Sequence, residues 1–364
     1  MKELYKYLLF FILICLVGYL FISCEKRDYQ YMETLVFDIS DDLPVPLSDI
    51  ADNVMKIELE TTDECLLDNV RQVELFENYL LVKDRSTFLY VFDMQGRFIR
   101  RIGMKGNGPG EYSFCLSFLL DEQNKKISLW TNIGILLYDI EGNFLEKIPL
   151  RPSWSGSINN VFFDNNLFYT LEDVFFDGYQ DKYFCVYDNN LNVVDSLQMY
   201  RYKVGKGAFI SNHPKPFSRN EGRIYVYAPP YNWDSENVSD TLYIVDNLRL
   251  RPFLEVQLSN WKKDEDIYWI FRTARYTVVS YRIYVQQGQG QYKKEYRSQC
   301  IYDYKTKNGR HAKDGFTDDI YDHDHVIISP LFRQDLFYYL KEGEYSEELR
   351  AEPNPTVYIG KFKE

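Results

Sequence analysis

The fold is decided by a short segment that occurs more than once in the chain. Residues 89–99 read Leu-Tyr-Val-Phe-Asp-Met-Gln-Gly-Arg-Phe-Ile, and residues 135–145 read Ile-Leu-Leu-Tyr-Asp-Ile-Glu-Gly-Asn-Phe-Leu. In both copies an apolar run ends in Asp-x-x-Gly and a second apolar pair follows. Aspartate hydrogen-bonds to the main chain that follows it, and glycine accepts a positive φ. The segment therefore predicts a tight hairpin between two antiparallel strands.

Weaker copies of this segment follow at residues 183–194, 242–254 and 299–303. Two more short strand-like runs precede each copy, for example at residues 70–75 and 79–83. The aspartates that align between the copies are 46, 49, 58 and 57 residues apart: Asp93, Asp139, Asp188, Asp246 and Asp303. Four strands repeated at this period indicate the blade of a β-propeller.

We therefore predict an all-β chain that forms a six-bladed β-propeller with four-stranded antiparallel blades. Five recognisable units and the less regular residues 316–363 supply the six blades. The strand predicted at residues 54–59 could pair with residues 357–362, which would close the ring and remove its exposed edges. A β-solenoid or a pair of β-sandwiches is the alternative that the same strands permit.

The N-terminus has the layout of a secretory signal. Lys2 and Lys6 precede an apolar run over residues 8–22, which is short for a membrane span. The residues that follow, Ser23 and Cys24, resemble a bacterial lipobox, whose cysteine is lipidated and becomes the mature N-terminus. An uncleaved signal anchor with an incidental cysteine is the alternative. We predict a lipoprotein signal peptide over residues 1–23, a tether and lead-in over 24–50, and the propeller over 51–364.

Composition excludes several classes of protein. The 364 residues are 45% hydrophobic and include 32 Tyr and 25 Phe, which excludes a disordered chain and supplies ample material for a core. The formal net charge of -12 argues against nucleic acid as a partner, because affinity for phosphates depends on clustered Lys and Arg. Four further cysteines lack metal-site spacing and are either buried thiols or disulfide partners: Cys65, Cys115, Cys185 and Cys300.

Four pieces of the sequence carry a resemblance to a known family. They are the opening Ile-Glu-Leu-Glu-Thr-Thr at residues 57–62, the turn from Phe92 to Gly96, the glycine-rich residues 102–112, and the ending Asn-Pro-Thr-Val-Tyr-Ile-Gly-Lys-Phe at residues 354–362. Together they resemble the six-bladed β-propeller lipoproteins of Bacteroides-type bacteria, which are relatives of the NHL-repeat propellers. The resemblance implies an exported propeller, and it implies no ligand or reaction.

One run of residues could bind a metal ion. Asp322, His323, Asp324 and His325 are consecutive and precede an apolar strand. In an extended strand His323 and His325 would share one face, so they could hold a divalent ion such as Zn²⁺ with a third ligand from another blade. A polar loop near the mouth of the ring is the alternative.

Arginines and aromatic residues are the other candidate ligand-binding groups. Arg85 and Arg275 could present cations to the central channel of the ring, and Tyr231 and Trp233 could stack on a sugar or a peptide. A solvated surface for the arginines and packing between blades for the aromatic residues are the alternatives.

The sequence contains no local catalytic motif such as a nucleophile elbow or a zinc-binding helix. We therefore predict a lipid-anchored, non-enzymatic binding module of the cell envelope, in the outer membrane on either of its faces. Its partners would be the membrane, through the lipid, and a peptide, a glycan or an envelope protein. An envelope hydrolase or lyase with a metal-assisted site at one mouth of the propeller is the alternative.

Overall fold

The chain forms β-strands over most of the residues that the computed structural model describes. These residues are 32–40, 43–85, 88–122, 124–149, 157–203, 216–228, 240–259, 265–285, 294–332, 335–343 and 352–364. The predicted signal peptide and Cys24 lie outside them. The chain divides into two units, and residues 34–364 are the unit that contains the sheets. Within the described ranges, no helix is both long and apolar enough to cross a bilayer.

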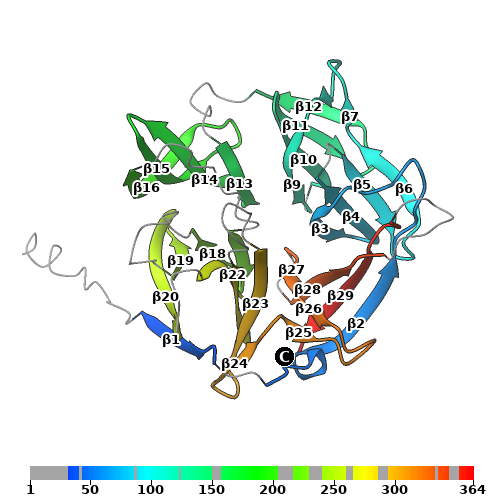
Figure 1. Ribbon diagram of the computed structural model, residues 1–364. Helices are drawn as coiled ribbons and strands as arrows, with labels where there is room; N and C mark the ends of the chain where they lie inside the picture. The colour runs from blue at the N-terminus through cyan, green and yellow to red at the C-terminus, as the bar shows by residue number, and fades with distance from the viewer. Residues whose placement is uncertain are drawn as a thin grey trace, which may run out of the picture. The chain divides into compact units, whose positions relative to one another are not determined.

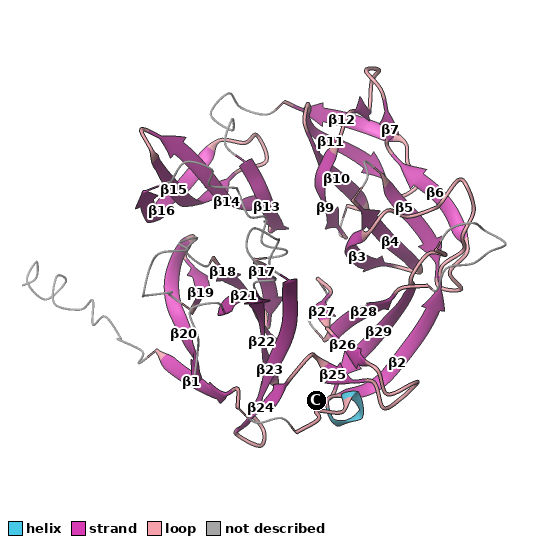
Figure 2. Cartoon of the chain, in the orientation of Figure 1, coloured by secondary structure: helices cyan, strands magenta, loops and turns pink. Residues whose placement is uncertain are grey.

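The first three blades each contain four strands in chain order (Figures 1 and 2). Blade 1 consists of β3 (Val70–Phe76), β4 (Tyr79–Asp84), β5 (Leu89–Asp93) and β6 (Phe98–Ile102). Blade 2 consists of β9 (Cys115–Asp121), β10 (Lys126–Thr131), β11 (Gly134–Asp139) and β12 (Phe144–Ile148). Blade 3 consists of β13 (Ser157–Asp164), β14 (Leu167–Phe176), β15 (Tyr179–Tyr187) and β16 (Val193–Lys203). Neighbouring strands of each sheet pair antiparallel.

The remaining three blades complete a ring of six sheets. Blade 4 consists of β17 (Phe217–Asn220), β18 (Arg223–Tyr227), β19 (Thr241–Asp246) and β20 (Arg249–Ser259). Blade 5 consists of β21 (Glu265–Arg272), β22 (Tyr276–Val285), β23 (Lys294–Asp303) and β24 (Asn308–Ala312). Blade 6 consists of β27 (Ser329–Pro330), β28 (Leu336–Lys341), β29 (Thr356–Phe362) and β2 (Ala51–Glu58). The predicted six-bladed, four-stranded propeller is confirmed.

The repeated aspartate forms the predicted turn between the third and fourth strands of a blade. In blade 1 the Asp93 carboxylate accepts hydrogen bonds from the main-chain N–H groups of Gln95 and Arg97, both at 2.9 Å. The equivalent Asp188 of blade 3 accepts from Asn190 and Asn192 at 2.9 and 2.7 Å. The same local hydrogen bonds therefore recur at the same place in different blades.

Strand β2 closes the ring, as predicted from the sequence. It pairs antiparallel with β29, with Val54 opposite Gly360 and Ile57 opposite Val357. Blade 6 thus takes its fourth strand from the beginning of the propeller and its other three strands from the end. Closure removes the edges that an open ring would expose at its two ends.

The lead-in predicted over residues 24–50 also contributes structure to the propeller. Strand β1 (Glu33–Asp38) adds a fifth strand to blade 4 beside β20. The Thr34 hydroxyl donates to the Glu255 carboxylate at 3.1 Å, and the Ser259 hydroxyl donates to the Phe37 carbonyl oxygen at 3.1 Å. The described part of the lead-in is therefore folded onto the ring.

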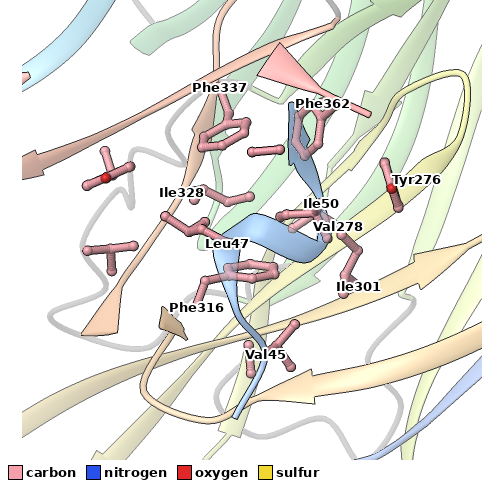
Figure 3. Close-up of a cluster of buried hydrophobic side chains, with 14 of the residues drawn as sticks. Val45, Leu47, Ile50, Tyr276, Val278, Ile301, Phe316, Ile328, Phe337 and Phe362 are labelled. Atoms are coloured by element: carbon pink, nitrogen blue, oxygen red, sulfur yellow. The ribbon is translucent and has the colours of Figure 1, made fainter. Parts of the chain in front are cut away.

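The short 3₁₀ helix η1 (Leu47–Asp49) belongs to a hydrophobic cluster that joins blades 5 and 6 (Figure 3). Leu47 and Ile50 are fully buried there against Val278 of blade 5 and Phe337 of blade 6. The cluster also includes Phe316, from the two-stranded ribbon of β25 (Phe316–Thr317) and β26 (His325–Val326). Apolar side chains of the lead-in therefore complete the packing where the ring closes.

Four cysteines lie among the described residues, and all four are buried and form no disulfide: Cys65, Cys115, Cys185 and Cys300. Their spacing leaves two roles open, buried thiols or disulfide partners, and in the structure they are buried thiols. Burial raises the pKa of the Cys115 thiol to about 11 and that of the Cys185 thiol to about 12.

Candidate functional site

Turns from several blades gather at one mouth of the ring. Because the strands of a blade alternate in direction, the turn after every first strand lies on the same face as the turn after every third strand. A cavity of about 1070 Å³ opens at this mouth. Residues of blades 2 to 6 line it, including the ends of the innermost strands β9, β13 and β17 and the turn after β21.

Aromatic residues form the apolar part of the cavity wall. Phe332, between β27 and β28, packs 5.8 Å from Phe162 of blade 3, ring centroid to centroid. Its main-chain N–H donates at 2.9 Å to the carboxylate of Glu74 on the innermost strand of blade 1. Since blades 3 and 6 face each other in a six-bladed ring, Phe332 reaches across the centre. Phe362 of β29 supplies a further buried aromatic side chain to the wall.

Charged and amide side chains line the same cavity at the tips of the turns. Asp164 is buried and forms an ion pair with Arg219 of blade 4, at 2.6 Å. The Asn165 amide donates to Asp164 at 2.9 Å, and the next residue, Asn166, has a positive φ of 61°. The turn after β17 adds the exposed Glu221. Amide and carboxylate groups therefore surround the apolar wall.

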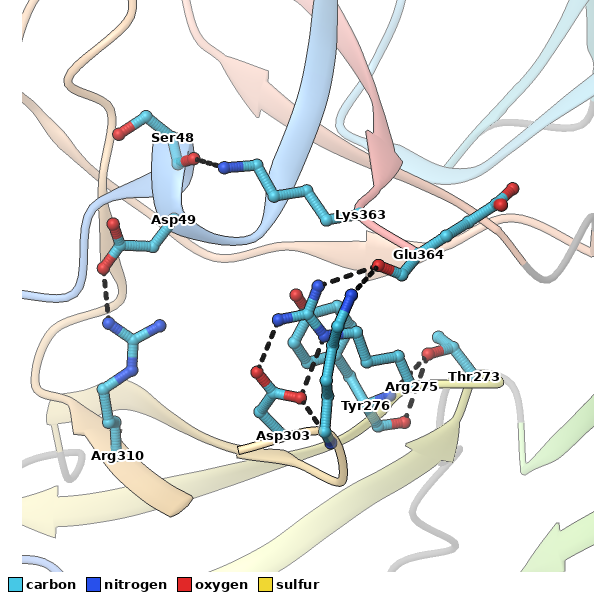
Figure 4. Close-up of polar contacts among 10 residues, drawn as sticks. Ser48, Asp49, Thr273, Arg275, Tyr276, Asp303, Arg310, Lys363 and Glu364 are labelled. Atoms are coloured by element: carbon cyan, nitrogen blue, oxygen red, sulfur yellow. Dashed lines mark hydrogen bonds and ion pairs between the residues drawn. The ribbon is translucent and has the colours of Figure 1, made fainter. Parts of the chain in front are cut away.

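Arg275 lines this cavity, but its guanidinium group is held by the protein (Figure 4). It donates two hydrogen bonds to Asp303, at 2.9 and 2.7 Å, and a third to the main-chain oxygen of Glu364 at 3.0 Å. Lys305 donates to the same oxygen of Glu364 at 3.2 Å. Hydrogen bonds from Arg275 lower the pKa of Asp303 to about 2. Arg275 thus connects blade 5 to the end of β29.

The ion pair of Arg275 and Asp303 predicts that the free energy of unfolding depends on pH in the acid range. Asp303 has a folded pKa of about 2 against an ordinary value of 3.8, so its contribution is present above pH 4 and disappears as the pH falls through 2. We expect Asp303→Asn to lower the free energy of unfolding by roughly 2 kcal/mol at pH 6 and by much less at pH 2.5. Urea unfolding at both pH values measures this. The same change at the equivalent Asp246, which is 41% exposed, is the control and should cost less at pH 6 than Asp303→Asn.

The structure does not bring the two predicted arginines together. Arg85 follows β4, the second strand of blade 1, whereas Arg275 precedes β22, the second strand of blade 5. The two residues therefore lie at opposite mouths of the ring. Arg85 is exposed, and its main-chain N–H donates to the Asp68 carbonyl oxygen at 2.7 Å. The predicted Tyr231 and Trp233 lie outside the described residues.

The predicted metal ligands His323 and His325 are both exposed. His323 is in a turn with a positive φ of 67°, and its main-chain N–H donates to the Asp318 carbonyl oxygen at 2.7 Å. His325 begins strand β26. The extended strand expected to put both imidazoles on one face is therefore not formed at His323. In the part of the chain that the structure describes, no group of three or more His, Cys, Asp or Glu is placed to hold a metal ion. The metal site stays a prediction.

Fold and cavity together define a class of protein, a six-bladed β-propeller with a cavity at one mouth of the ring. The chain belongs to the family described as "Domain of unknown function (DUF4934)", whose match spans residues 34–361. No curated protein matches the sequence.

Two crystal structures illustrate the likeness of this fold to known ones. One is described as a "Putative exported protein" from Bacteroides fragilis; it is 18% identical, has a TM-score of 0.64, and the match covers 91% of this chain and 100% of that one. The other is a member of the DUF4221 family from Bacteroides vulgatus; it is 10% identical, has a TM-score of 0.54, and the match covers 86% and 97% of the two chains. At these identities the likeness concerns the fold alone.

Proposed function

We propose that this protein is a non-enzymatic, lipid-anchored propeller of the cell envelope that binds a peptide, a glycan or a segment of an envelope protein. The ligand enters the cavity at the mouth formed by the turns of blades 2 to 6. The observation that carries the proposal is the cavity itself, which has about 1070 Å³, an aromatic wall and polar turn tips. Ligand sites in proteins typically combine an apolar wall with a few polar groups in a volume of roughly 300–1000 Å³.

The proposed location rests on the N-terminal sequence. Lys2 and Lys6, the apolar run and Cys24 have the order of a lipoprotein signal. The Bacteroides fragilis relative is described as a "Putative exported protein", which supports the proposal that this chain is exported too. Lipidation at Cys24 would hold the propeller at a membrane, in the outer membrane on either of its faces, while the ring stays free to bind.

A screen of ligands against a blocked cavity tests the proposal. Ala274 is exposed and lines the cavity in the turn before β22, so Ala274→Trp should fill part of the mouth without entering the core. We expect a peptide or an oligosaccharide from the screen to raise the thermal midpoint of the full chain in detergent, because a ligand of the folded state stabilises it by mass action. Ala274→Trp should abolish that shift.

The control is Met104→Trp, which adds the same indole to a residue that is 63% exposed and does not line the cavity. This variant should respond to the ligand as the unchanged protein does. A ligand whose shift survives Ala274→Trp binds elsewhere, and that result would reject the cavity as the site.

A further inference from the structure

We propose that the ligand of this cavity is cationic: a peptide segment that carries a lysine or arginine next to an aromatic or aliphatic side chain. This inference rests on the proposed function, because it names the class of ligand for the same cavity. Two independent features carry it. The charges around the mouth are unevenly distributed, and the apolar wall lies next to the negative side.

The negative side is formed by the turns of blades 2, 3 and 4. Among the described residues that line it are one cation, Arg219, and four carboxylates: Asp121, Glu122, Asp164 and Glu221. Arg219 forms its ion pair with Asp164 at 2.6 Å, so the net charge of this side is negative. Glu122 and Glu221 are both exposed and come from the two blades that flank blade 3. A concave wall of low polarity strengthens the field of such charges.

The opposite side, formed by blades 5 and 6, has cations whose donors are directed to the protein's own oxygen atoms. Arg275 is paired with Asp303 at 2.7 Å, and the Lys305 ammonium donates to the main-chain oxygen of Glu364. The Lys363 ammonium donates to the Ser48 carbonyl oxygen at 2.6 Å. Two more exposed carboxylates, those of Asp335 and Glu364, line this side, and they form ion pairs with the Lys361 ammonium at 3.9 and 3.6 Å. An anionic ligand would therefore compete with existing hydrogen bonds of these cations. Over the described residues that line the cavity, six carboxylates stand against four cations, so the excess charge that a ligand meets is negative.

The apolar wall adds the second requirement. Phe162 and Phe163 precede Asp164 on β13, so aromatic side chains lie directly beside the one carboxylate that blade 3 supplies to the cavity. Phe332 extends this surface from the other side of the ring. A lysine or arginine side chain has an apolar stem and a charged end, and it can lie along such a surface with its charge at the carboxylates. Aromatic rings also attract cations directly.

Three peptides that differ only in charge test the inference. The probes are N-acetylated, amidated Lys-Phe-Lys, Gln-Phe-Gln and Glu-Phe-Glu, titrated into the full chain in detergent. We expect Lys-Phe-Lys to bind about tenfold more tightly than Gln-Phe-Gln, and Glu-Phe-Glu to bind more weakly than either. The preference for Lys-Phe-Lys should shrink as salt is raised, because ions screen the exposed carboxylates.

Two matched double variants test whether the carboxylates at the mouth of the cavity cause the preference for Lys-Phe-Lys. Glu122→Gln with Glu221→Gln removes two charges from the cavity and keeps the shape of the side chains, and it should reduce the preference for Lys-Phe-Lys by roughly fivefold. Glu58→Gln with Glu141→Gln removes two charges from exposed residues that do not line the cavity, and it should leave the preference unchanged.

The negative results can be told apart. Equal binding of Lys-Phe-Lys and Gln-Phe-Gln, both abolished by Ala274→Trp, would overturn the cationic class and leave the proposed binding function intact. A shift with a neutral oligosaccharide and with none of the peptides would do the same. If neither the peptides nor the oligosaccharides bind, both the cationic class and the proposed function are wrong.

Discussion

Replacing Gly96 with alanine is expected to lower the free energy of unfolding by about 3 kcal/mol, because the new side chain has no room and the wrong backbone geometry. Gly96 has a φ of 80° in the turn of blade 1, a conformation that disfavours any residue with a Cβ. An added Cβ would lie 1.9 Å from the carbonyl oxygen of Glu58, at the end of the closing strand β2. That oxygen belongs to the main chain, so it cannot move without moving β2.

The equivalent glycine of blade 2 is the matched control for this prediction. Gly142 occupies the same turn position with a φ of 87°, but the nearest atom to an added Cβ is the Arg101 carbonyl oxygen at 3.6 Å, an ordinary contact. Gly142→Ala should therefore lower the free energy of unfolding only by the cost of placing a residue with a Cβ at a positive φ, on the order of 1 kcal/mol. Urea unfolding of both variants measures the difference. Equal losses would mean that the closeness of the Glu58 carbonyl oxygen adds nothing to the cost of Gly96→Ala.

These two glycines show why the blades can be predicted from the sequence. The turn depends on local hydrogen bonds, such as those from the main chain to Asp93 and Asp139, so its pattern is visible in eleven consecutive residues. The closing strand is also predictable, because residues 54–59 precede the first complete unit and residues 357–362 end the last one, which lacks a fourth strand of its own. Strand β1 is not. It lacks the Asp-x-x-Gly signal, and it joins blade 4 through residues 221 positions apart, Thr34 and Glu255.

The candidate site is less accessible to sequence analysis than the fold. Sequence reasoning identifies Arg275, and the structure places it at the cavity. It misses Phe162 and Phe332, because each belongs to a strand or loop that reads as ordinary core and only the closed ring brings them together. The sequence signal that could have located the cavity is position within the repeat, since many residues that line the cavity follow the first strand of a unit. Counting strands also assigns the two predicted arginines to different mouths of the ring. Arg85 follows the second strand of blade 1, whereas Arg275 precedes the second strand of blade 5.

The run from Asp322 to His325 illustrates a different limit. Its acidic residues suggest a metal site, but the structure pairs both of them, Asp322 and Asp324, with Lys341. The Lys341 ammonium of β28 donates to the buried carboxylate of Asp318 at 2.7 Å and also to Asp322. Burial alone would lower the pKa of Lys341, but its hydrogen bonds to these two carboxylates outweigh that effect and raise it. The hydrogen bond from Lys341 likewise lowers the pKa of Asp322. Lys341 is 19 positions from Asp322 in the sequence, so the run by itself does not reveal it.

Asp318→Ala is expected to lower the free energy of unfolding by about 3 kcal/mol, because it leaves a largely buried ammonium group without its main partner. The side chain of Asp318 is fully buried, and that of Lys341 is only 16% exposed. Asp318 also accepts a hydrogen bond from the Tyr339 hydroxyl at 2.9 Å, which the alanine would leave unpaired. Urea unfolding at pH 7 measures the loss. The double variant Asp318→Leu with Lys341→Met removes both charges, so it should recover the part of the loss that comes from the unpaired ammonium group.

His323→Ala distinguishes this ion pair from a metal site in the same segment. His323 is exposed, and its link to Asp318 uses the main-chain N–H, which alanine keeps. If the segment serves only to hold Lys341, the substitution should change the free energy of unfolding by less than about 0.5 kcal/mol, and a chelator should leave the thermal midpoint unchanged. If a divalent ion is bound there, removing a ligand or the ion withdraws the stabilisation that binding adds to the folded state. A loss with His323→Ala that matches the loss caused by the chelator would therefore establish the metal site.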